Sequence, residues 1–215
     1  MSLVLYYHPL SSFCHKALIA LYETGAAFET VLVDLGNTES RAAFLKVWPV
    51  GKFPVIKDND RNSVVPESTL IIEYLAQYYP GRSQLLPADP EQARQTRMWD
   101  RFYDLNLHVH MQKIVGDRIR PADGKDPTGV EHAKAQMRTA LDMIEQNMAK
   151  NTWTMGDAFT MADCAAAPAL WYTNKVLPFA ATHPNTSAYL QRLIDRPSFA
   201  RVLKEAEPHL HMFPQ

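Results

Sequence analysis

Hydrophobic and polar positions in the first 80 residues alternate between strand-like and helix-like stretches. Short runs rich in β-branched and aromatic side chains predict four strands, at residues 3–7, 28–33, 54–57 and 63–65. Apolar residues at helical spacing predict three helices, at residues 12–22, 40–47 and 67–78. The order β-α-β-α-β-β-α is typical of an α/β domain with a mixed sheet flanked by helices.

Beyond residue 80 the pattern changes to helical periodicity without strands. A polar, proline-bounded stretch at residues 81–90 reads as a linker. The predicted helices after it lie at residues 91–115, 129–150, 161–177, 186–195 and 198–205. We therefore predict an α/β domain at residues 1–80 and an all-α helical domain at residues 91–215.

Composition narrows the function classes. The chain has 22 basic and 23 acidic residues, and this near-neutral balance argues against a nucleic-acid partner. Two cysteines among 215 residues favour a reducing, cytoplasmic location. No apolar run approaches 18 residues and no signal-peptide pattern opens the chain, so we expect neither a membrane span nor secretion. His108 and His110 would point to nearly opposite faces of a helix, and we predict no metal site.

Three junctions of the first domain carry residues suited to a ligand. Ser11 and Ser12 stand between the first strand and the first helix, where a hydroxyl can cap the helix or help to stabilise an anion. Pro54 stands at the start of a strand, and a cis bond there would turn the Phe53 N–H and C=O outward, free to pair with an extended peptide. Glu67 opens the third helix, where the helix N-terminus can grip a carboxylate.

Together these motifs resemble the glutathione S-transferase superfamily. The resemblance rests on Tyr6-x-x-Pro9-x-Ser11-Ser12-x-Cys14, Gly51-Lys52-Phe53-Pro54-Val55, Pro66-Glu67-Ser68-x-x-Ile71-x-x-Tyr74-Leu75 and Gly156-Asp157-x-Phe159-Thr160-Met161-Ala162-Asp163. It spans essentially the whole chain and implies a thioredoxin-like N-terminal domain that binds glutathione. The helical domain would supply the pocket for an electrophile. The serine pattern is similar to that of cytosolic, serine-type, theta- or zeta-like bacterial members.

The resemblance also implies roles for single residues. Phe53 would pair its backbone with the cysteinyl part of glutathione, beside a cis Pro54, while Glu67 and Ser68 would hold the γ-glutamyl end. Lys52 is a candidate for the glycyl carboxylate, with His15 a weaker one.

The thiol of glutathione needs help to ionise, because a free thiol has a pKa of about 8.5. A hydroxyl donor and the first N–H groups of a helix would lower that pKa. By the resemblance, Ser11 is the preferred hydroxyl donor and Ser12 the fallback. The alternative is that Tyr6 or Tyr7 donates the hydroxyl, as tyrosine does in other classes of the family. Ser11-x-x-Cys14 also resembles a redox motif that has lost its attacking cysteine, and we interpret Cys14 as a buried apolar residue.

The electrophile pocket is the part with the weakest pattern. By analogy it would draw on the residues Leu10, Phe13, Tyr103, Leu107, His108, Met111 and Gln112, which fit a core between helices equally well. Trp99, Phe102 and Tyr103 could instead belong to a homodimer interface. Thr160-x-x-Asp163 reads as a structural capping box.

The preferred function is that of a glutathione transferase acting in detoxification on a small hydrophobic electrophile. A zeta-like, glutathione-dependent cis–trans isomerase of a maleylacetoacetate-type substrate is the second hypothesis, although Phe13 interrupts the Ser-Ser-Cys run expected of that class. A non-catalytic glutathione-fold binding protein is the third. Retention of both the helix-mouth hydroxyl and the Glu67-Ser68 pair argues against it.

Overall fold

The computed structural model describes residues 2–214, and its N-terminal part has the predicted order of strands and helices. The elements are β1 (Leu3–Tyr7), α1 (Ser12–Thr24), β2 (Phe28–Leu32), α2 (Thr38–Val47), β3 (Val55–Asp58), β4 (Ser63–Pro66) and α3 (Ser68–Tyr78). The sheet order is β2-β1-β3-β4, with β1 parallel to β2 and antiparallel to β3. This mixed, thioredoxin-like sheet followed by helices confirms the predicted fold class.

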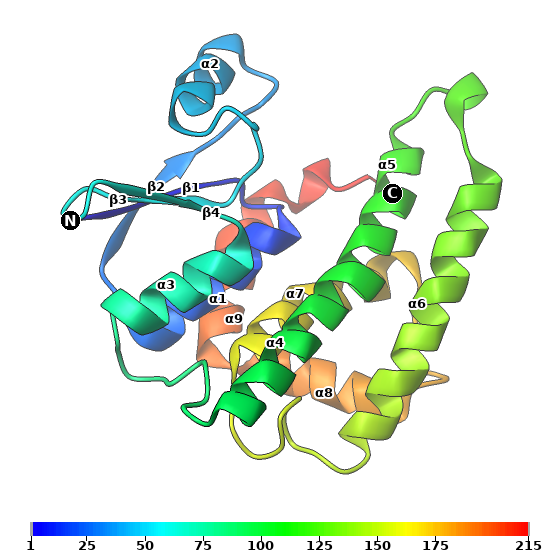
Figure 1. The fold of residues 1–215 in the computed structure, drawn as a ribbon. Coiled ribbons are helices and arrows are strands. Elements are labelled where there is room, and N and C mark those ends of the chain that lie inside the picture. The colour runs from blue at the N-terminus through cyan, green and yellow to red at the C-terminus, as the bar shows by residue number, and fades with distance from the viewer. Residues whose placement is uncertain (1, 215) are drawn as a thin grey trace.

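Two hydrophobic layers enclose the sheet. On one face Phe44 of α2 forms a small buried cluster with Val33 and Val55, and the partly buried Val47 of α2 packs against it. On the other face lie α1 and α3, as Figure 1 shows. Ten of the thirteen residues of α1 are buried, which means that α1 is covered on nearly all sides rather than along one stripe. The main core therefore continues from the sheet through α1 into the helical part.

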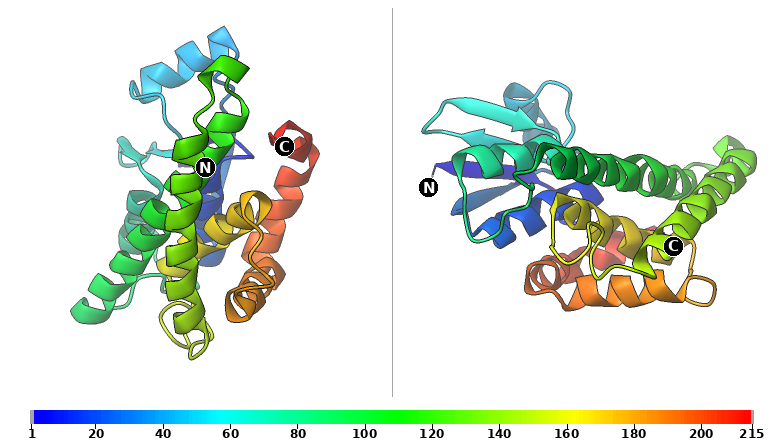
Figure 2. Two further views of the ribbon diagram at one scale, coloured as in Figure 1. Left: turned by 90° about the vertical axis from the view of Figure 1, so that its right-hand side faces the viewer. Right: turned by 60° about the horizontal axis from the view of Figure 1, so that its bottom comes forward.

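The remainder of the described chain is helical. The elements are α4 (Pro90–Tyr103), η1 (Asp104–His108), α5 (Val109–Arg118), η2 (Ala122–Gly124), α6 (Pro127–Met148), α7 (Met161–Val176), α8 (Pro184–Asp195), α9 (Pro197–Ala206) and η3 (Glu207–Met212). Figure 2 shows α4 and α5 as one long rod beside α6. The alanine-rich α7 packs against both α1 and α4, where its small side chains allow close approach. No helix among residues 2–214 combines the length and the apolar character that a membrane crossing requires.

Several helix boundaries differ from the prediction by one or two residues, and three differences have a clear description. Helix α8 starts at Pro184 rather than at residue 186, because a proline fits the first helical position, where no N–H partner is needed. The 3₁₀ turns of η3 at residues 207–212 were not predicted. The predicted helix at 91–115 is divided by η1, a π-helical turn that inserts extra backbone between α4 and α5.

Candidate functional site

Ser11 is the N-cap of α1. Its Oγ accepts a hydrogen bond from the backbone N–H of Cys14, at 3.3 Å. This bond uses a lone pair of Ser11 and leaves the hydroxyl hydrogen available for an external acceptor. The first turn of α1 contains no acidic side chain, so the positive end of its helix dipole is not neutralised locally. Capping and anion stabilisation are therefore compatible at this residue.

The loop before β3 supplies an extended backbone. The Phe53–Pro54 peptide bond is cis, and Gly51 has a φ of +71°, a conformation that favours glycine. The N–H and C=O of Phe53 make no hydrogen bond with any residue between 2 and 214. These two groups can therefore pair with a peptide-like ligand.

Helix α3 begins at a strained residue. Glu67 occupies its N-cap with a φ of +69° and makes no side-chain capping bond. A non-glycine residue in this region is strained by about 1–3 kcal/mol and is a common feature of functional sites. Ser68 follows as the first helical residue, and the backbone N–H groups of this end of α3 are open to a ligand carboxylate.

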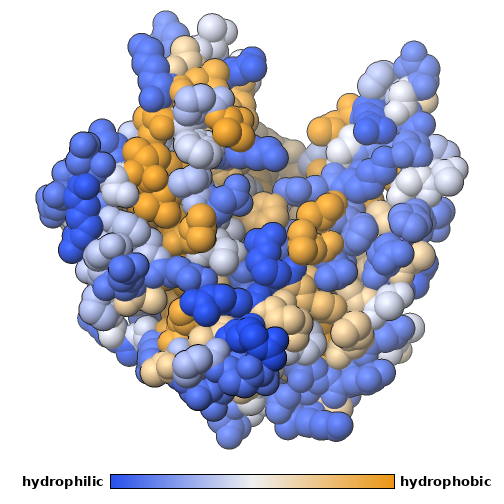
Figure 3. Space-filling view, in the orientation of Figure 1, coloured by the Kyte–Doolittle hydropathy of each residue, from blue (hydrophilic) through white to orange (hydrophobic). Residues whose placement is uncertain are grey.

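These three junctions line one pocket of about 400 Å³. Its walls consist of Ser11, Phe13, Leu35, Gly51, Lys52, Phe53, Pro54, Glu67, Ser68, Val109 and Gln112. In Figure 3 a hollow lies between the α2 side of the molecule and α5, with apolar surface on both sides. The pocket thus brings together groups from separate segments: two helix N-termini, one carboxylate, one ammonium and one free peptide group.

Several predicted site residues lie outside this pocket. Ser12 is only 3% exposed and is not part of the wall. Leu10 contributes no wall surface, although its carbonyl is tied to α7. His15 is fully buried, its Nε2 lies 2.5 Å from the Pro9 carbonyl oxygen, and burial lowers its pKa to about 4. His15 therefore stabilises the loop as a neutral ring rather than offering a charge to a ligand.

Of the predicted electrophile residues on the long helix, Gln112 lines the pocket, whereas the other four are core residues. Tyr103, Leu107 and His108 have no exposed surface, and Met111 is 4% exposed. Val109, the residue that directly follows the π-helical turn η1, lines the pocket instead. Phe13 does line the pocket, and its ring meets His108 edge-on at 4.7 Å.

Three pocket residues were absent from the sequence-based candidates: Leu35, Gly51 and Val109. Gly51 stood inside the quoted loop motif, and its glycine in a turn was the available signal. Leu35 and Val109 are apolar residues whose place in the wall depends on the loop after β2 and on the π turn, so their sequence context offered no signal.

The alternative thiol and tyrosine residues lie elsewhere. Cys14 is fully buried, which raises its pKa to about 12 and keeps the thiol protonated. The Tyr6 ring packs against Phe44 on the α2 side of the sheet. Tyr7 lines a different cavity, described next. None of the three is part of the pocket wall around Ser11.

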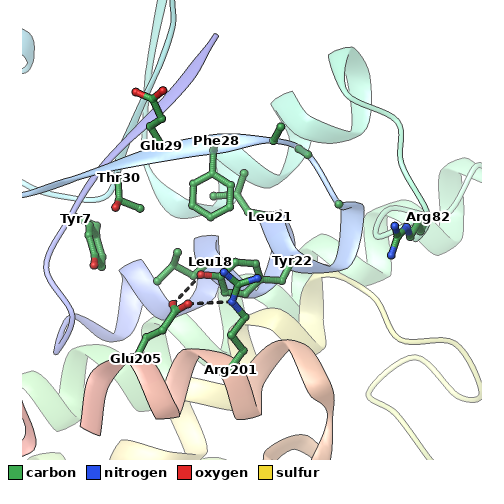
Figure 4. Close-up of a pocket in the computed structure, with 13 residues that line it drawn as sticks. Tyr7, Leu18, Leu21, Tyr22, Phe28, Glu29, Thr30, Arg82, Arg201 and Glu205 are labelled. Carbon is green, nitrogen blue, oxygen red and sulfur yellow. Dashed lines mark hydrogen bonds and ion pairs between the residues drawn. The ribbon is translucent and has the colours of Figure 1, made fainter. Parts of the chain in front are cut away.

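A larger cavity of about 820 Å³ lies between β2, α1 and α9 (Figure 4). Its central carboxylate, Glu205, accepts hydrogen bonds from Tyr22 at 2.7 Å and from Arg201 at 2.9 Å. This carboxylate is thus already satisfied within the protein. Neither Ser11 nor Ser68 reaches this cavity, and the chemistry suited to an anionic peptide lies in the smaller pocket.

Comparisons with known proteins agree with this geometry. The sequence profile of the glutathione S-transferase N-terminal domain matches residues 5–83, and that of the C-terminal domain matches residues 102–197. Glutathione S-transferase 3 of Zea mays is 32% identical over 209 residues, which cover 94% of this chain and 93% of that protein. The chain belongs to the glutathione S-transferase family.

Solved structures of glutathione S-transferases are similar to this chain as well. A glutathione S-transferase from Methylobacillus flagellatus with GSH bound has a TM-score of 0.85 at 25% identity, covering 94% of this chain and 98% of that one. One from Methylobacterium radiotolerans, in complex with glutathione sulfonate, has a TM-score of 0.82 at 27% identity and covers 93% of both chains. Both are similar to this chain across its two parts.

Proposed function

We propose that this protein is a glutathione transferase in which Ser11 stabilises the glutathione thiolate for attack on a small hydrophobic electrophile. The observation that carries the proposal is the convergence of Ser11, the Phe53 backbone and Ser68 in one pocket. Glutathione is an extended tripeptide with carboxylates at both ends and a thiol at its centre. The pocket offers matching groups, which are a helix N-terminus at Ser68, an outward peptide group at Phe53 and an ammonium at Lys52.

The chemical step that Ser11 supports is ionisation of the thiol. Its hydroxyl accepts from the Cys14 N–H, and this polarises the O–H hydrogen toward an acceptor. A hydrogen bond from that hydroxyl to the sulfur favours the thiolate, and the unneutralised dipole of α1 adds to the effect. The thiol proton is released to solvent water. The thiolate then attacks the electrophile, a new carbon–sulfur bond forms and the leaving group departs with its electron pair. Ser11 forms no covalent bond.

The test is a titration of bound glutathione by its thiolate absorbance in the unsubstituted protein and in two serine variants. Ser11→Ala should raise the pKa of the bound thiol by about one unit. Ser12→Ala, which removes a neighbouring buried hydroxyl outside the pocket, is the matched control and should leave that pKa unchanged. A rise with Ser12→Ala alone would transfer the role to Ser12. No rise with either variant would refute the serine assignment.

The exposed apolar surface supports the proposal of a homodimer. Val64, Leu70 and Tyr78 on β4 and α3 are 40–51% exposed, and Met98 on α4 and Leu105 on the π turn are 47% and 52% exposed. Apolar side chains that gather on neighbouring elements mark an interaction surface. Sedimentation equilibrium of Leu70→Glu against the unsubstituted protein tests this. A monomer for both would refute the dimer.

The cytoplasmic location stays a prediction, supported by two cysteines that are both unpaired and buried. Glutathione retention without conjugation of any aromatic halide would favour the non-catalytic hypothesis. Conversion of a maleylacetoacetate-type substrate would favour the isomerase.

A further inference from the structure

The loop that presents Ser11 is closely hydrogen-bonded. Within the loop, the Ser11 N–H donates to the His8 carbonyl at 3.0 Å, and the Leu10 N–H donates to His8 Nδ1 at 3.2 Å. The His8 N–H points to the Cys14 sulfur at 3.5 Å. Each N–H group of residues 8, 10 and 11 therefore has a partner, and Pro9 has no N–H to satisfy.

The carbonyl groups of this loop are partnered as well. The ring of His15 lies at the Pro9 carbonyl, and the backbone N–H of His15 donates to the Ser11 carbonyl at 2.9 Å. These donors come from the first turn of α1. The carbonyl of Leu10 is different, because its donor is the hydroxyl of Tyr172 on α7, at 2.8 Å and 162 residues away in the chain.

Tyr172 is held firmly. It is 1% exposed, and the Trp171 ring meets it nearly perpendicularly with the ring centroids 4.6 Å apart. The Phe213 ring also packs against it, at 5.6 Å between centroids. Arg118 at the end of α5 donates to the Pro214 carbonyl at 3.0 Å, which keeps the C-terminal segment in place. The Tyr172 hydroxyl is therefore delivered by a packed aromatic group of the helical part, not by a mobile side chain.

These hydrogen bonds fix one peptide unit from both ends. The bond between Leu10 and Ser11 is fixed at its N–H by His8 and at its C=O by Tyr172. The orientation of this peptide plane determines φ of Ser11, which is −80° here, and with it the direction of the Cα–Cβ bond that carries the hydroxyl. A hydrogen bond to sulfur weakens steeply when its direction changes.

We propose that Tyr172 is a positioning residue for the thiolate site: its hydroxyl holds the Leu10–Ser11 peptide and thereby aims the Ser11 hydroxyl at the sulfur of bound glutathione. The inference rests on the proposed role of Ser11. It assigns to the helical part of the chain a share in thiol ionisation that is separate from the electrophile pocket.

The test is Tyr172→Phe, which keeps the aromatic ring and its packing and removes only the hydroxyl. The pKa of the bound thiol should rise by roughly half a unit to one unit, and the glutathione Kd should change by less than about twofold. Tyr22→Phe is the matched control. Its hydroxyl also bridges α1 to the helical part, through Glu205, but does not touch the loop (Figure 4). Its thiol pKa should match that of the unsubstituted protein.

A double-mutant cycle separates aiming from general destabilisation. In a Ser11→Ala background, Tyr172→Phe should add no further rise in the thiol pKa. An equal rise in both backgrounds would show that Tyr172 acts by another route and would overturn the inference.

Amide hydrogen exchange of Leu10 and Ser11 supplies a readout that does not depend on glutathione. It should accelerate at least about tenfold in Tyr172→Phe and stay unchanged in Tyr22→Phe. If the unsubstituted protein binds no glutathione, or Ser11→Ala leaves the thiol pKa unchanged, the proposed function fails. If Ser11→Ala raises the thiol pKa while Tyr172→Phe changes neither that pKa nor the exchange, the role of Tyr172 alone is refuted. Faster exchange with an unchanged pKa would also refute it.

Discussion

Replacing Lys16 by methionine tests how the two parts of the chain are held together. The Lys16 ammonium has no exposed surface and lies 2.7 Å from Asp100 Oδ1 and 2.8 Å from Asp104 Oδ2. Its third partner is the Thr69 hydroxyl, at 2.8 Å. Lys16 belongs to α1, whereas the two carboxylates belong to α4 and the π turn. The substitution removes the shared cation and leaves two buried carboxylates close together.

The cost can be estimated from this geometry. Removing one partner of a buried, hydrogen-bonded ion pair lowers the free energy of unfolding by about 3–5 kcal/mol. That is a large share of the roughly 5–15 kcal/mol of a typical protein. Arg101, which is 49% exposed and lies 3.0 Å from Asp104, would offset part of the loss. His108 lies 3.3 Å from Asp104, but burial lowers its pKa and it stays neutral near pH 7.

The loss should depend on pH. In the unsubstituted protein, burial alone would raise the pKa of Asp104, but Lys16 and His108 hold it at about 2. Burial already raises the pKa of Asp100 in the unsubstituted protein. Without Lys16, burial and mutual repulsion raise it further and also raise the native pKa of Asp104 above the unfolded value of about 3.9. The native variant then binds more protons than its unfolded state, so its stability falls as pH rises. The deficit relative to the unsubstituted protein should be larger at pH 7.5 than at pH 5.5.

Urea unfolding followed by tryptophan fluorescence, at a fixed protein concentration, measures this difference at both pH values. The chain has four tryptophans to report on it. Adding Asp100→Asn and Asp104→Asn to Lys16→Met should restore part of the stability, because the unpaired charges are then gone. Arg94→Met, which breaks the exposed Arg94–Glu91 pair on the same helix α4, should leave the midpoint unchanged. A loss under about 1 kcal/mol, or one equal at both pH values, would refute the reasoning.

Three further predictions concern other parts of the structure. Asp163→Ala removes the carboxylate that accepts from two backbone N–H groups and from the Tyr189 hydroxyl in the core, so calorimetry should show about 3 kcal/mol or more of lost stability, while glutathione affinity stays unchanged. Cys14 should resist alkylation by iodoacetamide at pH 8 until denaturant is added, because burial raises its pKa to about 12; rapid labelling seen by mass spectrometry would contradict this. Glu67→Gln should weaken glutathione binding about tenfold in calorimetric titration without moving the thiol pKa, and equal affinity would remove Glu67 from the γ-glutamyl site.

The order of elements could be predicted because it depends on local patterns. Strand alternation, helical spacing and proline punctuation are all readable within a few residues. The capping box at Thr160 and Asp163 belongs to the same class, and the structure contains it. The clustering of Ser11 and Ser68 in one pocket required the family resemblance, since no local pattern states which loops meet.

Features that depend on long-range contact could not be predicted. Lys16 reads as an ordinary solvent-facing lysine, because its counter-charges lie 84 and 88 residues later in the chain. The apolar spacing predicts one uninterrupted helix across the π turn at Asp104–His108, and the resemblance assigns His108 to the pocket, whereas Val109 lines its wall. The hydrogen bond from Tyr172 to the Leu10 carbonyl likewise cannot be predicted from the spacing of apolar residues.

The nearly complete burial of α1 has a consequence for protein engineering by recombination. A crossover placed at the connector near residue 80 would separate α1 from the α7 and α9 residues against which it packs. Hybrids with relatives would then combine mismatched surfaces at Lys16, whose partners come from the other parent. Such hybrids should be viable when α1 is inherited with the helical segments and only the strands and α2 are exchanged. The segments that must come from the same parent are therefore those that pack around α1, and they are not contiguous in the sequence.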